Sequence, residues 1–262
     1  MKRNKTIIKN LFLGLALFLG TVLSAQDTAL KVMTYNLRFG EMASLEEMAV
    51  YIKDRNPDIV ALQECDWKTN RERALHQNGK AFVNELAYHT GMFGLYGKAI
   101  DYRDGYYGVG ILSKYPIVKS ERIFLPNPEP KTEQRILLIA EIELPNKSNI
   151  TFISTHLEVS SVKVRKEQIA FINSKIKEIN TAVILAGDLN ATPDSKEIKK
   201  GFDTWFNATD TAYTFASYKP EIKIDYILGY PHEHFSLIQT AVDTTCTLSD
   251  HFPVSSIIQI KR

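Results

Sequence analysis

The chain has 262 residues, with 32 basic and 30 acidic side chains and a formal net charge of +2. Residues 1–25 hold four basic side chains and no acidic one, so the rest of the chain carries 28 basic and 30 acidic groups, a formal charge of −2. Proteins that bind duplex nucleic acid usually carry a surplus of basic residues, because these neutralise the phosphates. The charge therefore does not favour nucleic acid as a partner, although it does not exclude one.

The first 25 residues have the pattern of an export signal. A basic beginning is followed by an apolar stretch over residues 11–23 and by Ser24 and Ala25, small residues that suit a cleavage site. The apolar stretch is shorter than the roughly 20 residues of a membrane-spanning helix, although a retained N-terminal anchor is the alternative. We therefore expect a signal peptide over 1–25, a mature chain over 26–262, and a periplasmic or extracellular location.

The next segment predicts a β-α-β unit. Residues 30–35 alternate as a strand and end at Asn36. Ser44 and Glu47 have the spacing of a capping box, and the helix that follows stops at Asn56. Residues 58–62 then form an apolar strand that leads to Glu64, so each strand of the unit has a polar residue at its tip.

The middle of the chain predicts consecutive strands. Apolar alternation runs over residues 108–113, 116–123, 136–144 and 150–155, which favours antiparallel pairing. A second helix, with isoleucines on one face, leads into a strand that ends at Asp188. Two mixed β-sheets packed face to face, with helices on the outside, accommodate all these elements in one domain over 26–262.

Five strand-end residues carry oxygen donors: Asn36, Glu64, Asp188, Asn190 and Asp250. Such hard donors suit Mg²⁺ or Mn²⁺. Each one alone is explained as a turn residue or a solvated strand end, and only the combination favours a site.

Two histidines accompany these oxygen donors. His156 ends one strand, and His251 directly follows Asp250. Histidine is the side chain best suited to proton transfer near neutral pH. Asp225 lies on a short apolar strand, where a buried carboxylate needs a partner and an imidazole is a natural one.

Seven short motifs in this order resemble the endonuclease/exonuclease/phosphatase superfamily, which has the DNase I-like fold. They are TYNLR (34–38), LQE (62–64), GVGILS (108–113), STHL (154–157), GDLN (187–190), KIDY (223–226) and SDHFP (249–253). The resemblance implies a four-layer α/β sandwich and a metal-dependent hydrolase that cleaves a phosphate ester.

The resemblance also implies roles for the strand-end residues. The metal ligands would be Glu64, Asn36 and Asp250. Asp188 and Asn190 would orient the attacking water and a phosphate oxygen. His251, paired with Asp225, would act as base or bind phosphate, and His156 would contact the phosphate or assist the leaving group.

Two further residues are candidates for substrate binding. Arg135 opens a strand and could reach a phosphate, although a strand-end arginine is commonly solvated. Tyr106 lies in an aromatic and charged loop over 101–107 that could form a wall of the substrate pocket or cover the edge of the core.

The two cysteines, Cys65 and Cys246, are too few for a disulfide scaffold or a thiolate zinc site. One bridge between them stays open in an oxidising compartment. Strand alternation, however, points Cys65 to the face opposite Glu64.

The sequence therefore predicts an exported, monomeric, Mg²⁺- or Mn²⁺-dependent phosphoesterase. Its substrate is a phosphodiester or phosphomonoester, with a lipid headgroup or a small molecule favoured. A secreted nuclease is the alternative, and a binding module without catalysis is a third reading.

Overall fold

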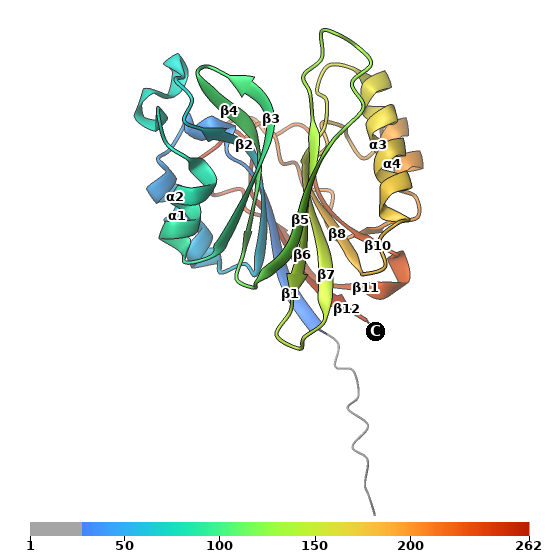
Figure 1. The fold of residues 1–262 in the computed structure, drawn as a ribbon. Coiled ribbons are helices and arrows are strands. Elements are labelled where there is room, and N and C mark those ends of the chain that lie inside the picture. The colour runs from blue at the N-terminus through green and yellow to red at the C-terminus, as the bar shows by residue number, and fades with distance from the viewer. Residues whose placement is uncertain (1–27, 262) are drawn as a thin grey trace, which may run out of the picture.

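The computed structural model describes residues 28–261, and the predicted signal peptide lies outside them. Two six-stranded sheets pack face to face, with helices on the two outer faces (Figure 1). The predicted α/β sandwich of two mixed sheets is confirmed. Among the helices of the described residues, none has the length and apolarity needed to cross a membrane.

The first sheet joins both ends of the described chain. Its strands, in spatial order, are β11 (Phe235–Val242), β12 (Val254–Ile260), β1 (Thr28–Asn36), β2 (Ile59–Trp67), β4 (Gly105–Ser113) and β3 (Phe93–Tyr102). Only β1 and β2 in this sheet run parallel, because α1 (Leu45–Arg55) connects them as a crossover.

The second sheet is built from the intervening segment. Its strands, in spatial order, are β5 (Ile117–Phe124), β6 (Ile136–Glu143), β7 (Asn149–His156), β8 (Val183–Asp188), β10 (Asp225–Tyr230) and β9 (Phe206–Asn207). Here β7 and β8 are the parallel pair, connected by α3 (Val162–Ile176). Each sheet therefore contains one β-α-β unit.

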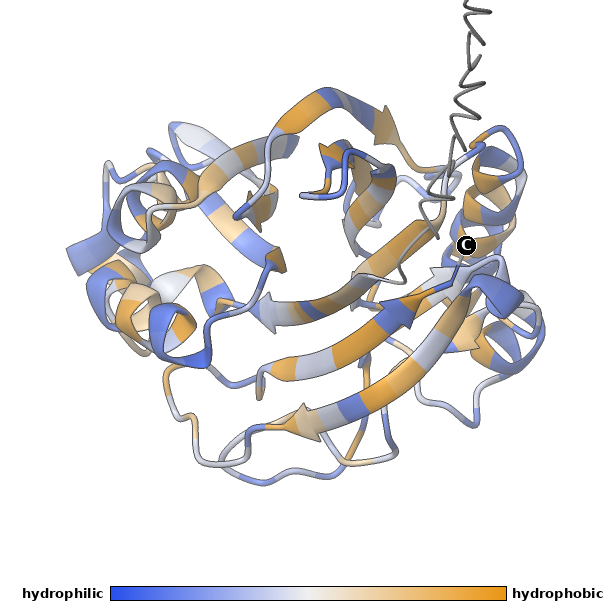
Figure 2. Ribbon diagram, turned by 90° about the horizontal axis from the view of Figure 1, so that it is seen from below, coloured by the Kyte–Doolittle hydropathy of each residue, from blue (hydrophilic) through white to orange (hydrophobic). Residues whose placement is uncertain are grey.

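Three apolar clusters hold the layers together. The central one lies between the sheets, the second lies under α1 and α2 (Phe82–Thr90), and the third lies under α3 and α4 (Lys196–Gly201). Apolar residues recur along the strands of both sheets in Figure 2, whereas the connecting loops are largely hydrophilic. Three 3₁₀ segments complete the fold: η1 (Arg38–Gly40), η2 (Glu72–Gln77) and η3 (His232–His234).

The capping box predicted for the first helix is present. The Ser44 side chain accepts from the Glu47 N–H, and the Glu47 carboxylate accepts from the Ser44 N–H. Asn56 ends the helix in the left-handed conformation. Cys65 and Cys246 are buried free thiols, and the hydroxyl of Tyr35 lies 3.5 Å from the sulfur of Cys246.

Asp243 fastens the end of β11 to α1. Its carboxylate accepts from the Tyr51 hydroxyl at 2.9 Å and from the Arg55 guanidinium at 2.6 Å. Burial alone would raise the pKa of Asp243, but hydrogen bonds from Thr245, Arg55 and Tyr51 outweigh it and lower the pKa to about 2.

We therefore predict that Asp243→Asn lowers the free energy of unfolding at pH 7 by roughly 1 to 2 kcal/mol. Because the pKa is lowered by folding, this stabilisation exists above about pH 4 and is lost as the pH falls from there towards 2. Urea unfolding at several pH values measures it. Asp203→Asn, a change at an exposed carboxylate, is the control. A difference between wild type and variant that does not shrink on acidification would contradict this account.

Candidate active site

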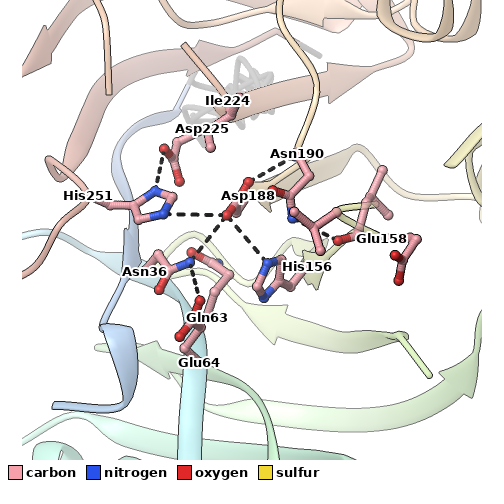
Figure 3. A network of polar contacts seen from close by, with 12 residues as sticks. Asn36, Gln63, Glu64, His156, Glu158, Asp188, Asn190, Ile224, Asp225 and His251 are labelled. Carbon is pink, nitrogen blue, oxygen red and sulfur yellow. Dashed lines mark hydrogen bonds and ion pairs between the residues drawn. The ribbon is translucent and has the colours of Figure 1, made fainter. Parts of the chain in front are cut away.

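Six of the predicted site residues meet where the two parallel strand pairs end. Asn36 ends β1 and Glu64 lies near the end of β2, whereas His156 ends β7 and Asp188 ends β8. Asp225 begins β10 directly opposite Asp188. His251 joins them from the loop before β12 (Figure 3). The carboxyl ends of both β-α-β units therefore supply one site.

The carboxylate of Asp188 is the centre of the cluster and is only 1% exposed. One oxygen lies 3.2 Å from the Asn36 amide nitrogen, 3.4 Å from His156 Nε2 and 3.7 Å from His251 Nε2. The other oxygen accepts the Asn190 N–H at 2.9 Å. Burial, followed by the negative charge of Asp225, raises the pKa of Asp188. Such a carboxylate can accept a proton near neutral pH.

His251 lies between two carboxylates. Its Nδ1 is 3.0 Å from Asp225, so the predicted histidine-aspartate pair is present. Burial lowers the pKa of His251, but the charge of Asp225, their hydrogen bond and the charge of Asp188 outweigh it and raise the pKa to about 10. The imidazole is therefore positively charged at neutral pH.

The pKa of His156 is shifted in the opposite direction from that of His251. Burial, together with the positive charges of Arg135 and His251, holds its pKa well below the usual value. Its Nδ1 is buried without a hydrogen-bond partner within the described residues. A buried polar atom without a partner is costly, and a bound substrate oxygen or hydroxyl would satisfy it.

Arg135 is not a solvated strand-end residue. It is 6% exposed, and its Nη1 lies 3.0 Å from Glu133. Its Nε, like Nδ1 of His156, has no partner in the part of the chain that the structure describes. Burial lowers the pKa of Arg135, but the charges of Tyr107, Glu133 and Glu64 outweigh it and raise the pKa.

Glu64 and Asn36 face each other across the first sheet's parallel pair. The Asn36 amide nitrogen donates to Glu64 at 3.2 Å, and the Asn36 oxygen accepts the Arg38 N–H at 3.0 Å. A register shift in β2 gives Glu64 a left-handed backbone, with φ of 56°. Burial raises the pKa of Glu64. Asn36 therefore does act as a turn residue through its bond to the Arg38 N–H. The same bond holds the amide group that orients Glu64.

Asp250 is paired with Arg38, a residue to which the sequence analysis gave no role. The Arg38 guanidinium contacts both Asp250 and Glu41. Ser249, next to Asp250, donates its hydroxyl to the Asn36 carbonyl at 2.7 Å. The TYNLR motif contains Arg38 at its end, and that position was the only available signal for it.

Two predicted residues have other contacts. The Asn190 side chain donates to the Leu157 carbonyl at 2.9 Å, and its backbone N–H supports Asp188. Tyr106 does not join the cluster: Lys98 Nζ lies 4.0 Å from the centre of its ring, in a separate depression. Side chains alternate along β4, so the neighbouring Tyr107 points to the opposite face of the sheet and is buried. A role for Tyr106 in substrate binding therefore stays a prediction.

The donor set fits a hard divalent cation, because carboxylates and an amide oxygen predominate. One group, Asp188, Asp225 and His251, has ligand atoms within 4.8 Å of one another. A protonated imidazole has no lone pair for a metal, so His251 with its raised pKa suits this role poorly. Glu64 has its hydrogen bond from Asn36 and a further carboxylate oxygen to offer, which makes it the better ligand.

Comparison with known proteins agrees with this geometry. The Endonuclease/Exonuclease/phosphatase family matches residues 33–251. The chain belongs to this family. Its members are metal-dependent hydrolases of phosphoester bonds, so the protein is an enzyme of that class.

Solved structures share the fold. An endonuclease/exonuclease/phosphatase family protein from Bacteroides thetaiotaomicron is 20% identical with a TM-score of 0.73, over 90% of this chain and 96% of that one. A mannosyl-6-phosphatase from the same organism is 20% identical with a TM-score of 0.69, over 87% and 99%. TDP2 from D. rerio, solved with a single-strand DNA product, is 19% identical with a TM-score of 0.66, over 88% and 99%.

The His251–Asp225 pair generates a test of how the two residues work. Asp225→Asn should keep the fold but lower kcat by roughly 10- to 10⁴-fold, because the imidazole loses its orientation and its counter-charge. His251→Ala should cost at least as much, and the double variant little more, since residues that act as a unit are not additive.

Steady-state kinetics of the two single variants and the double variant decide the matter, with circular dichroism as the control for folding. If the two losses multiply, Asp225 serves the core and not the imidazole.

Proposed function

We propose that this enzyme is an exported, divalent-metal-dependent phosphoesterase that hydrolyses a phosphodiester or phosphomonoester of a lipid headgroup or a small molecule. The observation that carries the proposal is the buried Asp188 carboxylate, which lies between the neutral imidazole of His156 and the positively charged imidazole of His251. This arrangement provides a proton acceptor beside a fixed positive charge, which suits the attack of water on phosphorus.

In the proposed reaction, Asp188 accepts a proton from the attacking water while the new bond between oxygen and phosphorus forms. The charged His251, held by Asp225, stabilises negative charge on a phosphate oxygen. The bond to the leaving oxygen then breaks, and a solvent water protonates that oxygen. Neutral His156, which lies beside Asp188, can donate a hydrogen bond to the leaving oxygen. Arg135 adds a second positive charge, and its Nε has no partner among the residues that the structure describes.

A divalent metal ion would supply further positive charge to the phosphate oxygens and the leaving oxygen. Glu64 would be its principal ligand. Asn36 would contribute its oxygen, and Asp250 the carboxylate that Arg38 now contacts. Mg²⁺ and Mn²⁺ are the ions that match these donors.

A secreted nuclease is the second candidate. The DNA product bound by the D. rerio TDP2 relative supports it, because the two folds correspond over nearly their whole length. The formal charge of −2 over residues 26–262 argues against duplex DNA as the main substrate. A binding module that has lost catalysis is not supported, since Glu64, Asp188, Asn190, Asp250 and His251 are all present.

We predict that the purified protein hydrolyses bis-p-nitrophenyl phosphate with Mg²⁺ or Mn²⁺ and that EDTA abolishes the activity. Glu64→Ala should lower turnover on the order of 10²-fold or more, because the principal ligand is lost, with partial recovery at high Mn²⁺. Mn²⁺ binding measured by calorimetry should weaken in parallel.

Glu121→Ala, which removes an exposed carboxylate on β5, is the matched control and should bind Mn²⁺ like the wild type. Unchanged Mn²⁺ affinity in Glu64→Ala would remove Glu64 from the metal site. A screen of sphingomyelin, phosphoinositides, plasmid DNA and RNA then separates the lipid, small-molecule and nuclease candidates.

The proposed export generates a separate prediction. Expressed with its own N-terminus, the protein should be found in the periplasm or medium and should begin close to Gln26, after cleavage behind Ala25. N-terminal sequencing of each cell fraction measures this. An intact Met1 on cytosolic protein would contradict export and make an intracellular nuclease a candidate again.

A further inference from the structure

The connection that leaves His156 is held by buried polar side chains that the proposed reaction does not use. They are Glu158, Arg165, Gln168 and Glu197, with exposed fractions of 1%, 7%, 0% and 6%. Burying an ion pair costs desolvation that the mutual attraction roughly offsets, so net stability is a weak reason for such a group. The positions that these side chains impose on the backbone are their clearer consequence.

The first turns of α3 hold the backbone of residues 158 and 159. The Gln168 amide oxygen accepts the Glu158 N–H at 3.0 Å. One nitrogen of the Arg165 guanidinium donates to the carbonyls of Glu158 and Val159, each at 2.9 Å. The guanidinium is itself held by Glu197 on α4, whose carboxylate lies 3.1 Å from Nη2. Arginine suits this position because its planar group offers several donors in fixed directions.

The catalytic cluster holds the other end of the same connection. Leu157, which directly follows His156, donates its N–H to the Asp188 carbonyl at 2.9 Å. Its carbonyl accepts from the Asn190 side chain, also at 2.9 Å. The connection is therefore bonded to site residues at its beginning and to α3 further on. A displacement of this segment would move the neighbouring imidazole.

The Glu158 carboxylate joins the connection to the segment before Arg135. One oxygen accepts from the N–H and the hydroxyl of Ser160, at 2.8 and 2.6 Å, and the other accepts the Glu133 N–H at 3.3 Å. Burial raises the pKa of Glu158, but the bonds from Ser160 and the charge of Arg135 outweigh it and lower the pKa. The ionised carboxylate accepts all three bonds. Figure 3 shows it outside the contacts that surround Asp188.

We propose that three of these side chains, those of Glu158, Arg165 and Gln168, are positioning residues. They fix the connection so that the imidazole of His156 meets the leaving oxygen. The inference rests on the proposed phosphoesterase function, in which His156 donates a hydrogen bond to that oxygen. The bonds described above run from these side chains to the backbone, to the connection or to α4, and none of them reaches a catalytic side chain. Their effect on catalysis therefore passes through the connection.

This role has a chemical signature. A hydrogen bond to the leaving oxygen offsets the negative charge that develops there, and it matters most when the leaving group is a strong base. Phenolate is a stronger base than p-nitrophenolate, so a displaced His156 should slow the loss of phenolate more. A side chain that only stabilises the fold would change both rates by the same factor, because it changes only the amount of folded enzyme.

The test compares bis-p-nitrophenyl phosphate with diphenyl phosphate, two diesters that differ only in their nitro groups, and uses the full chain. Gln168→Leu removes the acceptor of the Glu158 N–H, and Glu158→Gln replaces an accepting oxygen with a donor in a side chain of the same size. Asn173→Leu is the matched control. Asn173 also lies on α3, but its side chain bonds to the Gly201 carbonyl at 2.6 Å and to the Trp205 indole at 2.8 Å, away from the connection.

We expect Gln168→Leu and Glu158→Gln to lower kcat about tenfold more on diphenyl phosphate than on bis-p-nitrophenyl phosphate, with KM changed by less than about threefold. His156→Ala should show the same preference. Gln168→Leu should add no further preference in the His156→Ala background, since residues that act as a unit are not additive. Asn173→Leu should change kcat on the two esters by the same factor. Circular dichroism gives the folded fraction by which the rates are corrected.

Equal losses on the two esters in Gln168→Leu and Glu158→Gln, as in the control, would overturn the inference. A preference that Gln168→Leu adds to His156→Ala would also overturn it, because the effect would not pass through the imidazole. Where Gln168→Leu fails to fold, Glu158→Gln decides, because it keeps the volume of the side chain. Equal losses in His156→Ala itself, or a wild type that hydrolyses neither ester, would instead contradict the proposed function. The two failures are therefore distinguishable.

Discussion

The contacts of the Asp188 carboxylate join the two halves of the sandwich, and the site depends on them. Asn36, on the first sheet, donates to this carboxylate from the opposite side of the sheet interface, whereas His156 lies on the same sheet as Asp188. The close approach of β8 to β7 that brings Asp188 to His156 requires Gly187. A Cβ at that position would lie 2.0 Å from the Thr155 carbonyl oxygen. Because Asn36 and Asp188 lie on different sheets, any shift between the sheets would disrupt the catalytic geometry directly.

The pKa values of the charged residues in the site depend on one another. The raised pKa of Asp188 and that of His251 have a common cause, since Asp225 contributes to both. Behind Asp225, the buried Lys223 donates to the Asp225 carbonyl at 2.9 Å and to the Thr209 hydroxyl at 2.8 Å. Burial lowers the pKa of Lys223 to about 8. This lysine fixes the beginning of β10, and with it the position of the carboxylate that holds His251.

The sequence was sufficient to predict the parts whose signals are local. The capping box at Ser44 gave the limits of α1, and uninterrupted apolar runs gave β2, β7 and β8. The edge strands β3 and β11 were missed because their exposed outer positions hide any simple alternation. Pairing across distant segments, such as β1 with β12, has no local signature at all.

The site residues likewise separate into those with a local sequence signal and those that only the folded chain reveals. Strand-end position and residue type identified the cluster around Asp188, because the chemistry needs those residue types at converging ends. Tyr106 lies outside this cluster because register decides which of two neighbouring side chains points inward. The sequence indicated a strand from residue 108, whereas β4 begins at Gly105. The pairing of Arg38 with Asp250 joins residues 212 positions apart, so only the folded chain reveals it.

The described chain begins at the end of β1 that lies far from the active site. Thr28 pairs with Ile260 at that end, beside the C-terminus (Figure 1). Thr28 and the catalytic end of the strand at Asn36 are separated by the whole strand, roughly 26 Å. A chain tethered to a membrane through its N-terminus would therefore present its active site away from that membrane. Such a molecule would act on substrate held away from the surface that anchors it, whereas a released molecule has no such constraint.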